Sequence, residues 1–119
     1  MLMQISWHDK SPIYRQLSET LRDLILEGVY QDGESLPSVR AIAGEYRINP
    51  ITVSRAFQTL VDDELVESRR GLGMFVQEGA HDRLIAADRA AFIEQDLPKF
   101  RDRAERLGFS MDDLLKELL

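Results

Sequence analysis

The sequence predicts a mainly α-helical fold with one small β-hairpin, followed by a short helical tail. Three observations lead to this prediction. Two short segments with apolar residues at helical spacing are separated by only a few residues. The spacing then changes from helical to alternating around a glycine-containing turn, which is typical of a hairpin. Beyond residue 82 the helical spacing returns and continues toward the C-terminus.

The first helix is expected to begin at Ser11 and Pro12, with Ser11 as the N-cap and Pro12 at the first helical position. Its apolar residues follow at helical spacing and are Tyr14, Leu17, Leu21, Leu24 and Ile25. Gly28 should end this helix, because glycine readily adopts the left-handed conformation that follows a helix. Residues 1–10 form a leader in which Trp7 is a candidate packing anchor.

The second and third helices each begin at a residue that favours the N-cap position. Ser38 follows Pro37 and should cap a helix with one apolar stripe. The residues of this stripe are Val39, Ile42, Ala43 and Tyr46. Asn49 and Pro50 should start a third helix that extends to about Asp62. Its inward-facing residues are expected to be Val53, Phe57, Leu60 and Val61. Two short helices joined by a tight turn predict a helix-turn-helix.

A hairpin is expected next, with strands over residues 65–68 and 74–76 and a turn over residues 69–73. The turn carries two adjacent arginines, Arg69 and Arg70. A helix-turn-helix followed by a hairpin with a basic tip is the outline of a winged helix. We therefore expect residues 1–77 to form a winged helix-turn-helix domain.

Residues 78–119 are expected to form a tail of two helices, with Pro98 kinking or restarting the first and Gly108 ending it. Ser110 should cap the second helix. Apolar residues in the tail alternate steps of four and three over about three heptads. Two helices of about forty residues cannot enclose a core, so a second copy of the tail is the expected partner. The candidate dimerisation residues are Ala90, Ile93, Leu97, Phe100, Ala104 and Leu107.

The net charge of -6, from 15 Lys and Arg against 21 Asp and Glu, does not favour nucleic-acid binding by the chain as a whole. The charges are unevenly distributed, however. Between residues 36 and 58 the charged residues are Arg40, Glu45, Arg47 and Arg55. This segment is therefore locally basic and should attract phosphate groups.

Other classes of function lack the residues that they require. There is no cysteine, and His8 and His81 stand apart from other ligands, so we expect no metal site, no cofactor and no enzymatic activity. Gly71 and Gly73 lie in a hairpin turn and not between a strand and a helix, so they do not form a nucleotide-binding loop. No apolar run approaches the roughly 18 residues that span a bilayer. We expect a cytoplasmic protein without a membrane partner.

The start of the third helix allows two interpretations. In one, it is a capped surface helix whose polar residues are only solvated. In the other, it is a recognition helix, in which Thr52 and Ser54 donate to phosphates or bases and Ile51 contacts a thymine methyl group. Arg40 and the wing arginines favour the second interpretation, because the predicted fold brings them to one face.

The segment from Pro12 to Val76 resembles the DNA-binding domain of the GntR family of bacterial transcription regulators. The motifs LPS-x-R, NP-x-TVSRA and R-x-G-x-G-x-FV occur in the order and spacing of that family. The short two-helix tail is similar to that of the YtrA subfamily, and the resemblance implies a homodimer held by this tail. It also implies DNA contacts from Ser38, Arg40, Asn49, Ile51, Thr52, Ser54, Arg55, Arg70 and Gly71.

We therefore expect a homodimeric repressor that binds an inverted-repeat operator of its own operon or of a transporter operon. The alternative is a winged helix used for protein–protein contact without specific DNA binding, which the acidic composition favours. No small-molecule effector is identified by the sequence. Arg47 and Glu64 occupy positions that are commonly glycine in the family and that suit a left-handed backbone.

Overall fold

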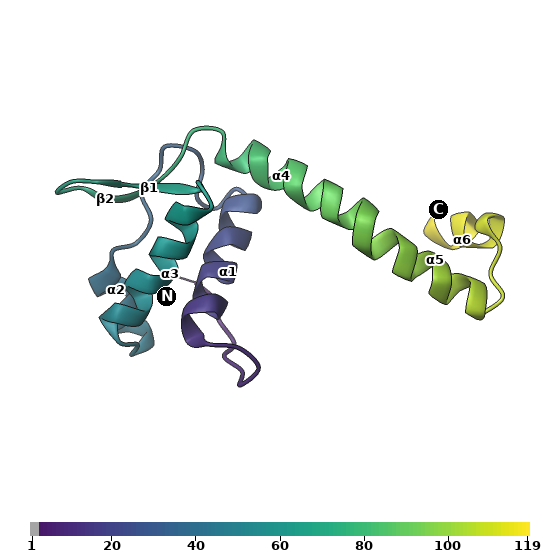
Figure 1. Ribbon diagram of the computed structural model, residues 1–119, viewed down its shortest axis with the longest axis horizontal. Coiled ribbons are helices and arrows are strands. Elements are labelled where there is room, and N and C mark those ends of the chain that lie inside the picture. Colours follow the sequence, from purple (N-terminus) through teal and green to yellow (C-terminus); the bar gives the residue numbers. More distant parts are fainter. Residues whose placement is uncertain (1–2) are drawn as a thin grey trace. The chain divides into compact units, whose positions relative to one another are not determined.

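The structure is a computed structural model that describes residues 3–119. It consists of two compact units that divide between Leu84 and Ile85. Figure 1 shows the course of the chain through both units. Within the described residues, no helix is long and apolar enough to cross a membrane.

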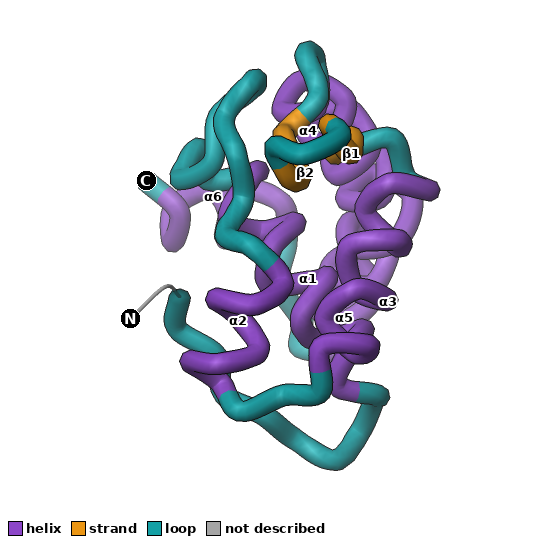
Figure 2. Tube along the Cα trace, turned by 90° about the vertical axis from the view of Figure 1, so that its left-hand side faces the viewer, coloured by secondary structure: helices purple, strands orange, loops and turns teal. Residues whose placement is uncertain are grey.

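The first unit contains a helix-turn-helix and a hairpin, as the sequence predicts. Its complete elements are α1 (Ile13–Leu26), α2 (Val39–Tyr46), α3 (Pro50–Asp62), β1 (Val66–Arg69) and β2 (Gly73–Val76). Helix α3 packs against both α1 and α2 and also contacts β1. Figure 2 shows the two strands at one end of this helical layer. Helix α4 (Ala80–Ala91) begins in the same unit.

Helix α1 begins one residue later than expected, and Ser11 is not its cap. Pro12 occupies the N-cap position, and its carbonyl accepts the first helical hydrogen bonds from the N–H groups of Arg15 and Gln16. The Ser11 carbonyl instead accepts a hydrogen bond from the Gln16 side chain at 2.7 Å. Gly28 follows the helix with a φ of 83°, which confirms it as the residue that ends α1.

The core of the first unit lies between α1, α2, α3 and the hairpin. Its largest fully buried side chains are Phe57, Leu17, Leu21, Ile25, Ile42, Leu60, Val53, Val66 and Val76. Of the four inward residues predicted for α3, Val53, Phe57 and Leu60 are confirmed as buried. The fourth, Val61, is half-buried. The prediction for Trp7 is wrong, because Trp7 is exposed, whereas Met3 is buried among the described residues of the leader, 3–10. Tyr46 fixes this leader by hydrogen bonding to the Met3 backbone.

Two residues other than glycine adopt a left-handed backbone, at the two positions expected from the sequence. Arg47 has a φ of 55° and ends α2, and Glu64 has a φ of 60° in the turn after α3. The Glu64 carbonyl accepts a hydrogen bond from the Arg83 guanidinium. Because this contact uses the backbone and not the Glu64 side chain, it holds the turn whatever residue stands there.

Strands β1 and β2 pair in antiparallel register from Val66 opposite Val76 to Arg69 opposite Gly73. The first strand begins one residue later than expected, because the Leu65 N–H still bonds the Leu60 carbonyl at the end of α3.

The second unit contains the end of α4, a π-helical turn η1 (Phe92–Asp96), α5 (Leu97–Arg106) and α6 (Met111–Leu118). Pro98 stands at the start of α5, where its missing N–H breaks no helical hydrogen bond. The Leu97 N–H bonds the Phe92 carbonyl, so the wider π-turn joins the two helices directly before this proline. Pro98 was expected to kink or restart the helix, but the backbone stays in the right-handed helical conformation at Asp96 and Leu97, so the chain passes from α4 to α5 without a break. The predicted Ser110 cap is confirmed, and it forms a capping box with Asp113.

Candidate nucleic-acid interface

The start of α3 is built by its cap. The Asn49 side chain accepts a hydrogen bond from the Ile51 N–H at 2.9 Å. Pro50 occupies the first turn of the helix, where its missing N–H costs no helical hydrogen bond. Val53 is fully buried, which fixes the rotation of the helix about its axis. The side chains that precede and follow Val53 are therefore directed away from the core.

The outward face of this turn is formed by short side chains and one long cation. Ile51 is 76% exposed, Ser54 and Arg55 are also exposed, and Thr52 is half-buried. Short side chains allow a helix to approach a nucleic-acid groove closely, and the free N–H groups at the helix start favour phosphate. The exposed Ile51 offers an apolar contact that suits a thymine methyl group better than it suits water.

Arg55 does not extend freely into solvent. Its guanidinium carbon lies 4.1 Å from the centroid of the Tyr14 ring at the start of α1. A hydrogen bond with Arg15 and the charge of Arg55 lower the pKa of Tyr14 from its ordinary value. This contact joins α1 to the outward face of α3. Sequence reasoning missed it, because no local pattern relates residues so far apart in the chain.

Helix α2 supplies two further candidate residues. The Ser38 hydroxyl accepts a hydrogen bond from the Ala41 N–H at 3.0 Å, so Ser38 caps the helix as predicted. Arg40 is exposed within the first turn of α2, which packs against α3. The candidate residues at the starts of α2 and α3 therefore lie on two helices that pack against each other.

The wing separates its two arginines into different environments. Arg69 lies over the Phe75 ring at 4.2 Å and forms an ion pair with Glu67 at 3.1 Å, so its charge is compensated on the strand. Arg70 and Gly71 are exposed in the turn, and Gly71 has a φ of 76° that favours glycine. The neighbouring Leu72 is 71% exposed, and it is a wing-tip residue that the sequence did not single out.

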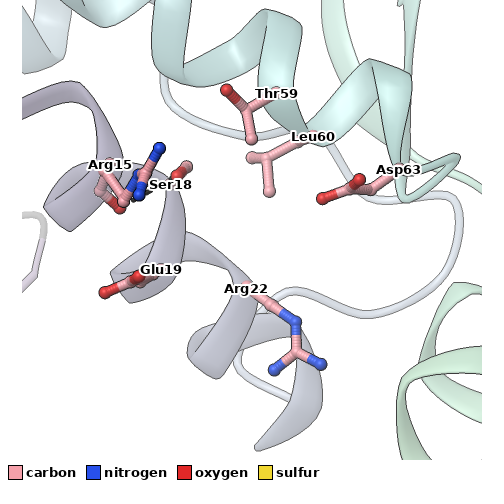
Figure 3. A pocket seen from close by; sticks show the side chains of 7 residues that line it. All are labelled: Arg15, Ser18, Glu19, Arg22, Thr59, Leu60 and Asp63. Atoms are coloured by element: carbon pink, nitrogen blue, oxygen red, sulfur yellow. Dashed lines mark hydrogen bonds between the residues drawn. The ribbon is translucent and has the colours of Figure 1, made fainter. Parts of the chain in front are cut away.

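A hollow between α1 and α3 is a weaker candidate site (Figure 3). It has a volume of about 300 Å³ and is lined by Arg15, Ser18, Glu19, Arg22, Thr59, Leu60 and Asp63. Its cations and carboxylates are balanced in number. The Ser18 and Thr59 hydroxyls donate to carbonyls of their own helices, at 2.9 and 3.1 Å. The hollow therefore has no excess of donors that would select an anion.

The candidate dimerisation residues all lie in the second unit. Five of them, Ala90, Ile93, Leu97, Phe100 and Leu107, are exposed, whereas Ala104 is 7% exposed. Ile93, Leu97 and Phe100 line an apolar groove of about 450 Å³ together with residues of α6. The α6 residues that line it are Met111, Leu114, Leu115 and Leu118. The sequence did not place these leucines in the same surface as the heptad seam.

The first unit has the architecture of a winged helix-turn-helix DNA-binding domain, in which α3 is capped by Asn49 and the wing tip is exposed. Residues 13–76 match the family described as "Bacterial regulatory proteins, gntR family". The chain therefore belongs to the GntR family and is a transcription regulator, not an enzyme.

Individual relatives extend this comparison to the tail. The chain is 31% identical to the HTH-type transcriptional repressor YtrA of Bacillus subtilis over 113 residues, which cover 95% of this chain and 86% of YtrA. The predicted membership of the YtrA subfamily is confirmed by this similarity.

Two solved structures are also similar. A GntR family transcriptional regulator from Listeria monocytogenes has a TM-score of 0.70 at 27% identity, covering 94% of this chain and 96% of its own. The AraR DNA-binding domain in complex with operator ORE1 has a TM-score of 0.54 at 25% identity, covering 63% and 94%.

Proposed function

We propose that the protein is a homodimeric transcriptional repressor that binds an inverted-repeat operator through the start of α3. The observation that carries this proposal is the division of the first turns of α3. Val53 and Phe57 are buried on one side, while Ile51, Ser54 and Arg55 are exposed on the other. A helix held this firmly by its inner face can present a fixed set of side chains to the bases.

The remaining candidate residues have supporting roles in this proposal. Ser38 and Arg40 meet the phosphate backbone from the start of α2, and Arg70 and Gly71 meet it from the wing tip. Asn49 and Thr52 complete the contact at the start of α3. The operator-bound AraR domain, which shares the fold, supports a DNA-binding role for this surface.

The dimer in this proposal is formed by the tail. We assign residues 1–77 to DNA binding and residues 78–119 to dimerisation. The exposed apolar residues Leu97, Phe100 and Leu107 support this assignment, because a second tail would remove them from water. Two copies related by a two-fold axis would read half-sites about 34–36 Å apart, and the operator would be an inverted repeat.

Repression is proposed because the relative from Bacillus subtilis is described as a repressor. The target would be the operon of the protein itself or a transporter operon, and the protein would act in the cytoplasm, where the chromosome is found. These parts of the proposal come from family resemblance.

The test is operator binding measured by fluorescence anisotropy on the DNA upstream of the protein's own gene. Arg55→Ala should weaken binding by about 1–3 kcal/mol if Arg55 reaches a base. Gln58→Ala is the matched control, because Gln58 is exposed on α3 and bonds Asp62 of the same helix. Binding should also fall steeply with salt.

Salt-insensitive binding, or equal affinity for operator and random DNA, would contradict the proposal. Either result would favour the alternative of a winged helix used for protein–protein contact.

A further inference from the structure

The contact between Tyr14 and Arg55 joins two segments that are distant in the sequence. Tyr14 lies in the first turn of α1, and Arg55 lies on the outward face of α3. The Tyr14 ring is half-buried and packs against the core, so its position is fixed by the fold. The guanidinium carbon of Arg55 lies 4.1 Å from the centroid of this ring. The long side chain of Arg55 is thereby held against a ring that packs on the core.

The stacking of Arg55 on Tyr14 leaves the hydrogen-bond donors of Arg55 available. An arginine side chain has large rotamer entropy, which a bound state must restrict. A ring beneath the guanidinium plane restricts the side chain before DNA arrives. The ring covers one face of the guanidinium, whereas the N–H donors of the guanidinium point outward in the guanidinium plane. A stacked arginine can therefore still donate two parallel hydrogen bonds to a guanine or a phosphate.

Arg69 provides an internal comparison. It also lies over an aromatic ring, that of Phe75, at 4.2 Å, but the Glu67 carboxylate accepts hydrogen bonds from its guanidinium at 3.1 and 3.2 Å. Within residues 3–119, Arg55 has no such carboxylate partner. Both arginines therefore stack on an aromatic ring, but only the charge of Arg69 on the wing is balanced by a carboxylate, that of Glu67.

The surroundings of the Tyr14 hydroxyl are also cationic. A hydrogen bond with Arg15 and the charge of Arg55 both lower the pKa of this phenol. Two guanidinium groups near one point of the surface create a positive potential that attracts phosphate oxygens. This local potential is opposite in sign to the net charge of the chain.

We propose that Tyr14 is a positioning residue for DNA recognition: its ring holds Arg55 in the orientation in which Arg55 contacts the operator. The first turn of α1 is therefore part of the DNA-binding machinery, although it belongs to neither the helix-turn-helix nor the wing. This inference rests on the proposed function, since Arg55 must contact DNA for its orientation to affect affinity.

The test is a double-mutant cycle in the full-length chain, on the DNA sequence that the wild type selects from a random library. Tyr14→Leu removes the ring and keeps an apolar side chain, and Tyr14→Phe keeps the ring and removes only the hydroxyl. Tyr14→Leu should weaken binding to the selected sequence about two- to fivefold, the range of an exposed cation–π contact. Binding to a scrambled duplex should change less, and Tyr14→Phe should restore the preference for the selected sequence.

The cycle separates positioning from simple destabilisation. In an Arg55→Ala background, Tyr14→Leu should have no further effect on affinity, because the residue that it positions is gone. An equal loss in both backgrounds, or no loss in either, would overturn the inference. Melting temperatures are measured in parallel, and Tyr14→Met replaces Tyr14→Leu if the leucine variant does not fold.

The outcome also distinguishes this inference from the proposed function. If the wild type selects no sequence, both are wrong. If it selects one and Arg55→Ala weakens binding, but the cycle shows no coupling, only the positioning role of Tyr14 is wrong.

Discussion

The two units of the chain treat their apolar residues in opposite ways. In the first unit Leu17, Ile25 and Phe57 are fully or almost fully removed from solvent. In the second unit Ala104 is the one apolar residue that is buried among the described residues 85–119. The large hydrophobic side chains that are exposed in this unit are Ile85, Phe92, Ile93, Leu97, Phe100, Leu107, Phe109, Met111, Leu115, Leu118 and Leu119.

This difference indicates what each unit needs in order to be stable. The first unit buries its apolar surface within one chain, so the hydrophobic effect can stabilise it alone. The second unit is two connected helices with an apolar surface on the outside, which is unfavourable in water unless another surface covers it. Its stability should therefore depend on protein concentration, whereas that of the first unit should not.

The largest expected effect is on the first unit. Phe57→Ala should lower the free energy of unfolding by about 3–5 kcal/mol, because it removes an almost fully buried ring and leaves a cavity in its place. Chemical denaturation followed by circular dichroism measures this change. Gln58→Ala, at the neighbouring exposed position, should change stability by less than about 0.5 kcal/mol. Similar losses in the two variants would contradict the assigned core.

The second prediction concerns the tail. Phe100→Asp should give monomers by light scattering and weaken operator binding about a hundredfold, because two linked half-site contacts become independent. The first unit should keep its fold. Gln95→Asp adds the same charge at an exposed position outside the apolar groove and should stay dimeric. A dimeric Phe100→Asp protein would show that the tail is not the interface.

The third prediction compares the two left-handed residues. Glu64→Gly should stabilise the first unit by roughly 1 kcal/mol, because glycine adopts a positive φ without strain. The Arg83 contact is kept, since it reaches the backbone carbonyl. Arg47→Gly should stabilise similarly but weaken DNA binding if Arg47 contacts a phosphate. Thermal melting measures the stability and anisotropy measures the DNA binding. A lower melting temperature for Glu64→Gly would show that the left-handed backbone at Glu64 does not destabilise the fold.

The smallest expected effect is at the cap of α6. Ser110→Ala should cost roughly 0.5–1 kcal/mol of helix stability, because it removes the hydroxyl that bonds the Asp113 N–H. Hydrogen bonds from the backbone and side chain of Ser110 lower the pKa of Asp113. A lowered pKa stabilises the folded state above the ordinary carboxyl value near 4, and this contribution is lost as the pH falls through the lowered pKa.

The pH dependence gives the measurement for this cap. Helicity of the wild type, followed by circular dichroism, should decrease in acid below about pH 4. Asp113→Asn should remove part of this decrease, because an amide does not titrate. An unchanged acid transition in Asp113→Asn would show that the capping box does not contribute to it.

Much of the fold could be predicted because its signals are local. Ser38 and Asn49 cap the helices that follow them, and both contacts lie within three residues. The left-handed positions Arg47 and Glu64 could also be placed, because each lies directly after a helix. Ser11 was misplaced by one residue because Ser and Pro can share the start of a helix in two ways.

The arrangement of the candidate site depends on tertiary contacts, which local patterns do not contain. The platform that Tyr14 forms under Arg55 crosses from α1 to α3. Strand pairing brings Phe75 opposite Glu67, and Arg69 contacts both of these residues. The charge of Arg69 is therefore paired on the wing and not free for DNA. The sequence could name the basic residues of the wing, but only the fold separates Arg69 from Arg70.

DNA reading by a dimer through the start of α3 is tested most directly by a selection of DNA bound by the wild type from a random duplex library. We expect an inverted repeat with half-sites one helical turn apart, about 10–10.5 base pairs between centres. The same selection with Arg55→Ala should lose its preference at the same position in each half-site. A library without an enriched sequence, or an enriched single half-site without its inverted copy, would contradict a dimer that reads DNA through the start of α3.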